Sequence, residues 1–290
     1  MKHNDISGVD LPGLYLVPSP LGNLGDLTLR VIEVIKKADM VCAEDTRRTL
    51  KLLNYLEVKV PLISYREQNH QKAWPKIAEV LAAGGKVALL TDAGSPAVSD
   101  PGAALAAAAR ADDFSVIPLP GPSAVISALM ASGFSADRFT FAGFLPAKTG
   151  ERRDYLQSLA ACRWTLVFFE TPHRLAASLV DLAEIFGDRQ ALLAREMTKL
   201  HEEYFFSGLE EMAEEVARNP RKGEMTLVVQ GFSGQEEIKE LDLEYIRKIA
   251  LEDQRPVKVL AAELAVKYKR GRAELYKILT GFRRNEESGG

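Results

Sequence analysis

Short apolar runs alternate with amphipathic segments along the first part of this chain. A bounded apolar run of about four to eight residues is typical of a buried strand, whereas apolar positions that recur about every three or four residues indicate a helix. The apolar runs predict strands at residues 14–17, 40–43, 61–64, 86–91 and 115–118. The amphipathic segments predict helices at residues 27–37, 46–56, 71–83, 103–110 and 123–132. Because alternating strands and helices are typical of a largely parallel sheet, we expect an α/β domain over residues 1–119.

A proline-rich step at residues 118–122 is expected to be a domain boundary. Beyond it the pattern predicts strands at residues 139–144, 164–169, 190–195, 201–207 and 225–229, with helices at 151–161, 175–186 and 209–219. Some of these strands follow one another like a hairpin, which favours a mixed sheet in a second α/β domain over residues 120–233. A linker at 231–235 leads to helical patterns at 241–252, 257–268 and 272–280, which predict a small helical module over residues 236–290.

The composition is that of an ordinary globular protein, with 47% apolar and 27% charged residues among 290. No apolar run approaches the roughly 20 residues that cross a bilayer, so no membrane association is expected. The N-terminal residues lack the apolar core of a secretory signal, which favours a cytoplasmic protein. The two cysteines, Cys42 and Cys162, have neither a disulfide framework nor the spacing of metal ligands, and we expect no bound metal.

Charge is distributed unevenly along the chain. Residues 255–284 hold nine lysines and arginines against two glutamates, a net charge of +7. Because the whole chain has a net charge of −3, the residues outside this stretch carry a net charge of −10. A basic end on an acidic body indicates a polyanionic partner that touches one region, although a solvated basic helix is the alternative. Within the sequence KYKRGR, Tyr268 either stacks on a nucleic-acid base or faces the core of the helical module.

Three turns rich in glycine and proline directly follow predicted strands, at residues 18–25, 92–102 and 120–124. Ligands of open α/β sheets bind beside the carboxyl ends of strands, and glycine lets a ligand approach the backbone there. The first turn, with Gly22 and Gly25, lacks the GxGxxG spacing of a dinucleotide-binding loop. Each turn taken singly also fits a structural role, but the three together predict a binding site.

The second and third turns carry groups that suit a polar ligand. Asp92 stands at a strand end, although it can instead cap the next helix. Gly94, Ser95 and Ser99 offer backbone and hydroxyl groups in the same turn. Ser123 is placed to cap the helix that begins in the third turn.

Eight segments, in order along the chain, carry a family likeness. They are LYLVPSPLGNLGDLT, AEDTR, LLTDAGSPAVSDPG, PLPGPSAVISAL, GFLPAK, FFETPHR, AREMTK and KGEMTLVV. In this order they resemble the tetrapyrrole methylase-like superfamily and, more closely, the bacterial 16S ribosomal RNA (cytidine 2′-O)-methyltransferases. The resemblance implies two α/β domains with S-adenosylmethionine (SAM) in the cleft between them, a homodimer, and 16S rRNA or the small ribosomal subunit as the partner. It further implies methyl transfer to the ribose 2′-hydroxyl of a cytidine.

Two other functions are weighed against this one. A methylase of a tetrapyrrole precursor or another small molecule would share the fold, but AGSP at residues 93–96 replaces the GGDP typical of the tetrapyrrole-acting branch. An RNA-associated protein that binds SAM without catalysis is the second alternative. The resemblance and the positions of the turns together assign the cofactor contacts to both domains. These residues are Pro20, Asp92, Ala93, Gly94, Ser95, Val98, Ser99, Ser123, Ala124, Phe169, Glu170, Met197 and Met225.

A protonated 2′-hydroxyl is a poor nucleophile, so methyl transfer to it needs a base or local charge stabilisation. Glu44, Asp45 and Arg47, in AEDTR, are candidates because they stand at a strand end. The alternative is that Asp45 caps a helix and pairs with Arg47 or Arg48. His173, in FFETPHR, is a candidate base or a phosphate contact. The alternative is that this segment starts a helix at Pro172 with Thr171 as its cap. The charged residues of AREMTK either form a structural salt bridge or contact the substrate.

Overall fold

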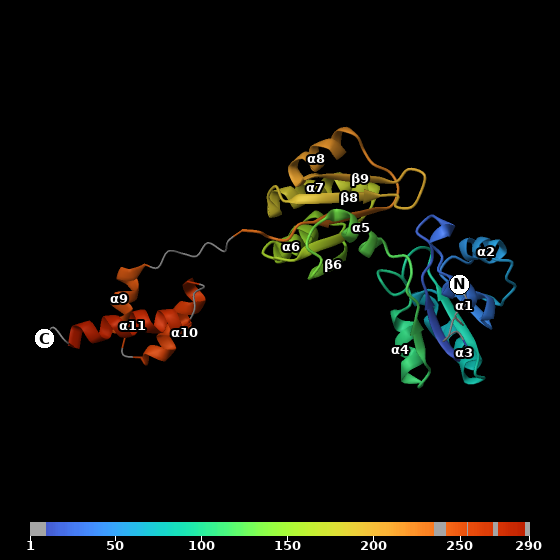
Figure 1. Ribbon diagram of the computed structural model, residues 1–290, viewed down its shortest axis with the longest axis horizontal. Coiled ribbons are helices and arrows are strands. Elements are labelled where there is room, and N and C mark those ends of the chain that lie inside the picture. The colour runs from blue at the N-terminus through green and yellow to red at the C-terminus, as the bar shows by residue number, and fades with distance from the viewer. Residues whose placement is uncertain (1–9, 235–241, 254, 269–271, 288–290) are drawn as a thin grey trace, which may run out of the picture. The chain divides into compact units, whose positions relative to one another are not determined.

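The computed structural model describes residues 10–234, 242–253, 255–268 and 272–287 (Figure 1). The chain divides between Phe232 and Ser233 into two compact units, the first containing two β-sheets and the second helical. The division of the first unit near residue 120 stays a prediction. Of the sequence features above, Gln235, Leu241 and residues 269–271 lie outside the described residues.

The first sheet is wholly parallel, as predicted. Its strands are β1 (Gly13–Val17), β2 (Met40–Ala43), β3 (Leu62–Ser64), β4 (Lys86–Leu90) and β5 (Val116–Pro118), in the order β3-β2-β4-β1-β5. The helices are α1 (Leu29–Lys37), α2 (Thr46–Tyr55), α3 (His70–Ala82) and α4 (Ala103–Ala111), with 3₁₀ turns η1 (Leu24–Asp26) and η2 (Glu67–Asn69). The predicted bounds of these strands and helices are confirmed to within two residues.

Successive residues of β1 serve two separate cores. Tyr15 packs with Val31 of α1 and Leu53 of α2 on one face of the sheet. Its neighbour Leu14 packs with Ile77 of α3 on the other face. Successive strand side chains point to opposite faces, so a strand covered by helices on both sides is apolar throughout. This accounts for the unbroken apolar runs of β1 and β4.

The strand order brings the three predicted turns together. β1 lies between β4 and β5, and all three strands run parallel. The turns that leave their carboxyl ends, at residues 18–25, 92–102 and 120–124, therefore meet at one edge of the sheet.

The second sheet is mixed, which confirms the prediction. Its strands are β6 (Phe139–Phe144), β7 (Thr165–Glu170), β8 (Gln190–Arg195), β9 (Glu203–Gly208) and β10 (Met225–Val229), in the order β6-β7-β10-β8-β9. β6 and β7 are parallel, and the other neighbouring pairs are antiparallel. Helices α6 (Thr149–Leu159), α7 (Pro172–Phe186) and α8 (Leu209–Arg218) share one core with this sheet. Helix α5 (Ala124–Ser132) packs in a separate cluster that also contains Leu21 and Ala93 of the first two turns.

The first residues of helix α7 and strand β9 each have a local reason. Helix α7 begins at Pro172, before the apolar pattern that starts at residue 175, which confirms the helix-start interpretation of FFETPHR, since proline at the first helical position needs no amide donor. Strand β9 begins at Glu203 rather than at residue 201, because the Glu202 carboxylate accepts a hydrogen bond from the backbone N–H of Thr198 and keeps the chain in a turn.

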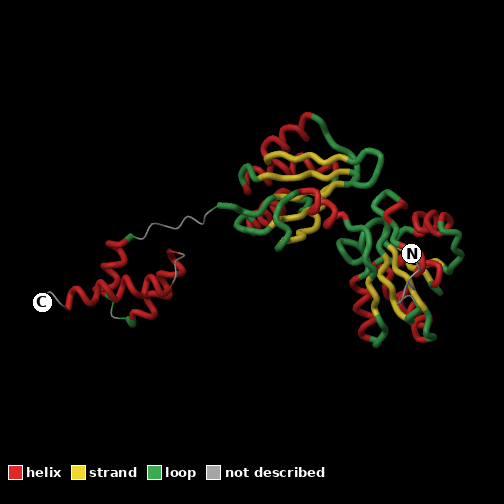
Figure 2. The backbone as a smooth tube through the Cα atoms, in the orientation of Figure 1, coloured by secondary structure: helices red, strands yellow, loops and turns green. Residues whose placement is uncertain are grey.

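The described part of the second unit consists of α9 (Leu243–Glu252), α10 (Val257–Tyr268) and α11 (Arg272–Glu287) (Figure 2). It has its own apolar core, which includes Ile246, Leu264 and Leu275. Tyr268 is 5% exposed and belongs to this core, so the core interpretation of Tyr268 is confirmed. No helix within the described ranges is long and apolar enough to span a membrane.

Candidate functional site

The three turns at the edge of the first sheet are bonded to one another. Ser19 and Gly94 exchange two backbone hydrogen bonds of 2.9 Å, which join the first turn to the second. The Ser95 hydroxyl donates to the carbonyl oxygen of Pro122 at 3.1 Å and joins the second turn to the third. At Gly121 a side chain would collide with the first turn, so glycine allows the first and third turns to approach closely. The turns form one braced surface rather than three separate loops.

The second turn has an unusual backbone. The φ angles of Gly94 and Gly102 are +74° and +143°, in the region that favours glycine. Ala97 and Ser99 also have positive φ, of +65° and +59°. Such conformations cost of order 1–3 kcal/mol for a residue with a side chain and cluster at functional sites. Tertiary contacts must therefore maintain the shape of this turn.

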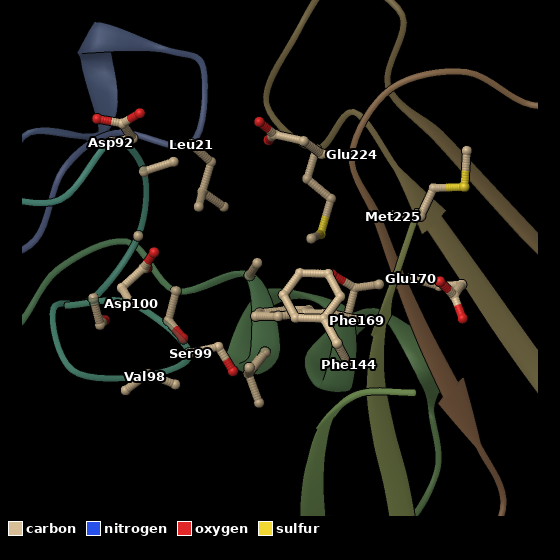
Figure 3. Close-up of a pocket in the computed structure, with 18 of the residues that line it drawn as sticks. Leu21, Asp92, Val98, Ser99, Asp100, Phe144, Phe169, Glu170, Glu224 and Met225 are labelled. Carbon is tan, nitrogen blue, oxygen red and sulfur yellow. The ribbon is translucent and has the colours of Figure 1, made fainter. Parts of the chain in front are cut away.

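A pocket of about 350 Å³ lies beside the turns, and both sheets contribute to its walls. Leu21 and Asp92 come from the first two turns, whereas Phe144 and Phe169 come from β6 and β7 (Figure 3). Ser123 caps α5 by accepting from the backbone N–H of Ile126, which places the start of that helix in the wall. The volume falls within the range of small-molecule sites.

Most of the predicted cofactor residues meet in this pocket. Those that line it are Asp92, Ala93, Gly94, Ser95, Val98, Ser99, Ser123, Ala124, Phe169, Glu170, Met197 and Met225. Pro20 instead lines a neighbouring cavity, which shares Arg48 and Asp92 with the pocket. The lining residues that the sequence did not predict are Leu21, Arg48, Asp100, Val125, Phe144, Thr171, Pro172, Gly223, Glu224 and Thr226. All of them except Phe144 lie within two positions of a predicted cofactor or catalytic residue, and Phe144 itself ends β6, so position near a strand end was the available signal.

The Glu170 carboxylate is engaged by its own domain. It accepts hydrogen bonds from the Thr171 N–H and the Ser178 hydroxyl, both at 2.7 Å, and pairs with Arg174 at 2.9 Å. Figure 3 shows it beyond Phe169 as seen from the second turn. A buried charge requires such partners. Any contact of Glu170 with a ligand is therefore expected from its backbone.

Asp45 and Arg47 lie at the start of α2, outside the lining of the pocket. The Asp45 carboxylate accepts from the Arg47 N–H at 2.9 Å and pairs with its guanidinium at 2.7 Å. These bonds to Arg47 hold the pKa of Asp45 well below its usual range. The Asp45 N–H donates in turn to Asp92 at 3.2 Å, and Arg48 pairs with Asp92 at 3.4 Å. The helix-cap interpretation of Asp45 is confirmed, and its catalytic role stays a prediction.

Glu44 lines a groove that adjoins the pocket and has a volume of about 890 Å³. Burial, followed by the nearby Asp92 carboxylate, raises the pKa of Glu44. Ser99 and Asp100 line both the pocket and the groove. His173 is exposed in the first turn of α7 and lines neither of them.

The charged residues of AREMTK form ion pairs. Arg195 pairs with Glu203 at 2.7 Å, and Lys199 pairs with Glu196 at 2.9 Å and with Glu224 at 3.0 Å. The salt-bridge interpretation of this segment is therefore confirmed. Across the described ranges, no group of three or more His, Cys, Asp or Glu residues is arranged to hold a metal ion.

Comparison of the sequence with known proteins gives consistent matches. Residues 13–213 match the family described as Tetrapyrrole (Corrin/Porphyrin) Methylases. The chain is 41% identical to Ribosomal RNA small subunit methyltransferase I of Escherichia coli O157:H7, over 96% of this chain and 98% of that protein. Proteins of the same name from Vibrio cholerae serotype O1 and a Synechocystis strain are 40% and 44% identical, over 92% and 75% of this chain and 93% and 78% of their own lengths.

Solved structures share the fold of the two sheets. The uroporphyrin-III-C-methyltransferase from Thermus thermophilus superposes with a TM-score of 0.55 at 22% identity, over 76% of this chain and 94% of that chain. A cobalt precorrin-4 methyltransferase superposes with a TM-score of 0.57 at 16% identity, over 78% of this chain and 98% of that chain. At these identities the likeness concerns the fold alone.

Proposed function

Because the chain belongs to the tetrapyrrole methylase family, and within it to the family of ribosomal RNA small subunit methyltransferases I, we propose that it methylates 16S ribosomal RNA. The methyl group of SAM is transferred to the ribose 2′-hydroxyl of a cytidine. The observation that carries this proposal is a cofactor-sized pocket with walls from both sheets, in a chain whose likeness to the ribosomal RNA methyltransferases extends into the helical module.

The residues of the pocket fit SAM in shape and in charge. Leu21, Val98 and Phe169 offer apolar and aromatic surface for the adenine ring and the methylene groups. Asp92 and Glu224 add carboxylates to the lining, which attract the sulfonium and ammonium groups of the ligand. We propose that the predicted cofactor residues hold SAM, with Glu170 acting through its backbone and Pro20 from the adjoining cavity.

Positioning is the main task of the protein in this reaction, since SAM supplies a methyl group that is already activated. Holding the reacting atoms aligned at about 3–3.5 Å can lower the barrier by roughly 7–11 kcal/mol. The mutually bonded turns and the strained second turn provide a rigid frame for that alignment. Glu44, Asp45, Arg47 and His173 remain candidates for contacts with the acceptor nucleotide.

We propose that the helical module contacts the phosphate backbone of the RNA. Neutralisation of phosphates dominates affinity for nucleic acids, and Lys258 and Lys277 are exposed. Some of the basic residues have structural partners: Arg255 pairs with Asp253, and Arg283 donates to the backbone carbonyl of Ala250. The number of cations available to phosphate is therefore smaller than the charge of the segment. We further propose that the protein is a homodimer and lies in the cytoplasm.

Incubation of the protein with tritiated SAM and candidate acceptors tests the proposal. The acceptors are transcribed 16S rRNA, small ribosomal subunits that carry unmodified rRNA, and uroporphyrinogen III. Label at a cytidine, in a linkage that resists alkaline hydrolysis, is the expected result. Label in the porphyrinoid alone would establish the small-molecule alternative. Binding of SAM with no transfer to either RNA substrate would favour the RNA-associated protein without catalysis.

A further inference from the structure

We propose that the cavity lined by Pro20 is a phosphate site, which holds a phosphodiester group of the RNA strand next to the acceptor nucleotide. This side cavity lies between the first turn and helix α2 and has a volume of about 220 Å³. It shares Arg48 and Asp92 with the cofactor pocket. The inference rests on the proposed function and adds to it a place where the substrate is held beside the reacting atoms.

Two cations on one face of α2 line the side cavity. They are Arg48 and Lys51, and residues with this spacing are neighbours on the surface of a helix. Lys51 is exposed and has no ion-pair partner in the described part of the chain. Lysine binds phosphate as a point charge, and neutralisation of phosphates dominates affinity for nucleic acids. The side cavity therefore offers an ammonium group to an anion.

The carboxylate in the lining of the side cavity already has partners. Asp92 accepts a hydrogen bond from the Asp45 N–H at 3.2 Å and pairs with Arg48 at 3.4 Å. The Arg48 side chain is nevertheless 62% exposed, and a guanidinium has several donors, so some of them remain for a second acceptor. Because Lys51 lies on the same face as Arg48, two cations in the described lining face this one carboxylate. The balance of charge favours an anion.

Two buried hydroxyl groups line the side cavity without a partner. Ser19 and Thr49 are each 4% exposed, and neither hydroxyl forms a hydrogen bond with another residue in the described ranges. The Thr91 hydroxyl, by contrast, donates to the backbone carbonyl of Gly94 at 3.2 Å. Buried polar groups are normally satisfied by protein, water or a ligand, and a hydroxyl can donate to a phosphate oxygen. The hydroxyls and the cations together indicate a ligand rich in acceptor oxygens.

The walls of the side cavity are held in place from several directions. Ser19 is joined to the second turn by its two backbone hydrogen bonds with Gly94. Gly22 lies against Lys199, because a Cβ atom at Gly22 would collide with the Lys199 side chain. Thr49 belongs to α2, whose apolar residues pack in the core of the first sheet. A site whose shape exists before the ligand arrives loses less conformational entropy on binding.

The position of the side cavity indicates which anion it holds. Because Arg48 and Asp92 line both cavities, a group bound in the side cavity lies next to the cofactor. Every nucleotide of an RNA strand carries a phosphate beside its ribose, so an acceptor ribose at the methyl group brings a phosphate close to it. Phosphate contacts fix the position of a nucleic acid on a protein, and here they would align the 2′-hydroxyl. The carboxylate of SAM is the other anion within reach, and the experiment separates the two.

Substitutions in the full-length protein test the side cavity. Lys51→Gln removes the ammonium group, and Thr49→Val replaces the buried hydroxyl by a methyl group of similar size. Lys76→Gln is the matched control, because Lys76 is an exposed lysine of α3 that lines neither the cofactor pocket, nor the groove, nor the side cavity. Affinity for transcribed 16S rRNA is measured by filter binding over a salt series, with S-adenosylhomocysteine present. Calorimetry measures the affinity for SAM, and thermal unfolding checks that each variant is folded.

We expect Lys51→Gln to lower the affinity for RNA about tenfold at low salt, as for the loss of one charged hydrogen bond. The slope of log affinity against log salt should fall by about 0.7–0.9, the contribution of one phosphate. Thr49→Val removes no charge, so it should lower the affinity for RNA by about threefold or more and leave the slope unchanged. Both variants should bind SAM as the wild type does, and Lys76→Gln should match the wild type throughout.

Other results would overturn the inference. An RNA affinity and a salt slope equal to those of the wild type in Lys51→Gln would exclude the phosphate site, and so would an equal loss in Lys76→Gln. Loss of SAM affinity in Lys51→Gln and Thr49→Val, with RNA affinity retained, would assign the side cavity to the carboxylate of the cofactor. Label transferred to RNA by the wild type, together with unchanged variants, overturns only this inference. Transfer to the porphyrinoid alone overturns the proposed function and the inference with it.

Discussion

Gly94 has a φ of +74°, lines the pocket and exchanges two backbone hydrogen bonds with Ser19. A residue with a side chain in this conformation is strained by of order 1–3 kcal/mol, and the turn relaxes by moving. We therefore expect Gly94→Val to lower the affinity for SAM by about tenfold or more and to lower Tm. Isothermal titration calorimetry and thermal unfolding measure the two effects.

Gly84 offers a matched control for this substitution. Its φ is +78°, it lies in the turn between α3 and β4, and an added Cβ atom would have no neighbour within 4 Å. Gly84→Val should lower Tm to a similar degree and leave the affinity for SAM unchanged. If both variants lose affinity equally, the second turn has no special part in binding the cofactor.

Asp100 should reduce the stability of the folded protein at neutral pH. Its pKa in the folded state is about 6, above an ordinary value of 3.8, and burial is the main cause. Between these values the folded chain binds more protons than the unfolded chain, so the free energy of unfolding falls as pH rises through this window. The Tm of Asp100→Asn relative to wild type should therefore increase by a few degrees from about pH 4 to about pH 7. A difference in Tm that is constant over that range would show that the pKa is not raised.

At the level of elements, α2 illustrates how one residue invites two interpretations. Asp45 stands at a strand end with other charged residues, which predicts chemistry, and it also caps α2. Asparagine caps helices as well as aspartate does, whereas alanine does not. We expect Asp45→Asn to retain both Tm and methyl transfer, and Asp45→Ala to lower Tm by a few degrees. Thermal unfolding and the rRNA assay provide the measurements.

The same two variants also test whether Asp45 takes part in catalysis. A loss of transfer of about 100-fold in Asp45→Asn, with Tm retained, would support the catalytic role predicted for Asp45. Arg47→Gln provides a companion measurement, because it removes the partner of the cap while the cap itself stays.

At the level of the whole molecule, the two units have separate cores. We expect removal of residues 233–290 to leave the affinity for SAM unchanged and to reduce methylation of 16S rRNA strongly, because the pocket lies in the first unit and the basic stretch in the second. Calorimetry with SAM and the rRNA assay compare the two effects. Equal losses would point to a folding defect and not to a role in RNA binding.

Substitutions in the intact chain complement the truncation. Lys258→Ala with Lys277→Ala changes two exposed residues of the helical module. Each phosphate contact contributes about 0.7–0.9 to the slope of log affinity against log salt, so the double variant should lower that slope by roughly 1.5. An unchanged slope would show that these lysines do not face the RNA.

Local signals in the sequence located the strands and α-helices, although α11 continues to Glu287, beyond its predicted end at residue 280. Apolar spacing predicted the parallel character of the first sheet and the mixed character of the second, because each strand and helix is specified by side chains a few positions apart. The same signals marked the strand ends, which is why most of the predicted cofactor residues line one pocket. The sequence patterns did not predict which hydrogen-bond and ion-pair partners the polar side chains have. That Glu170 is satisfied by Ser178 and Arg174, and that Asp100 has no partner among the described residues, depends on which groups face each other in three dimensions.

The order of the strands in the first sheet was likewise not predictable from local patterns. Local patterns specify that β1, β4 and β5 exist and that a glycine-rich turn follows each of them. They do not specify that β1 lies between the other two, because strand order depends on pairing between segments far apart in the chain, and several orders would bury similar apolar surface. Only the folded chain places the three turns at one edge, braces them with the Ser19–Gly94 and Ser95–Pro122 hydrogen bonds, and sets Asp100 where the pocket adjoins the groove.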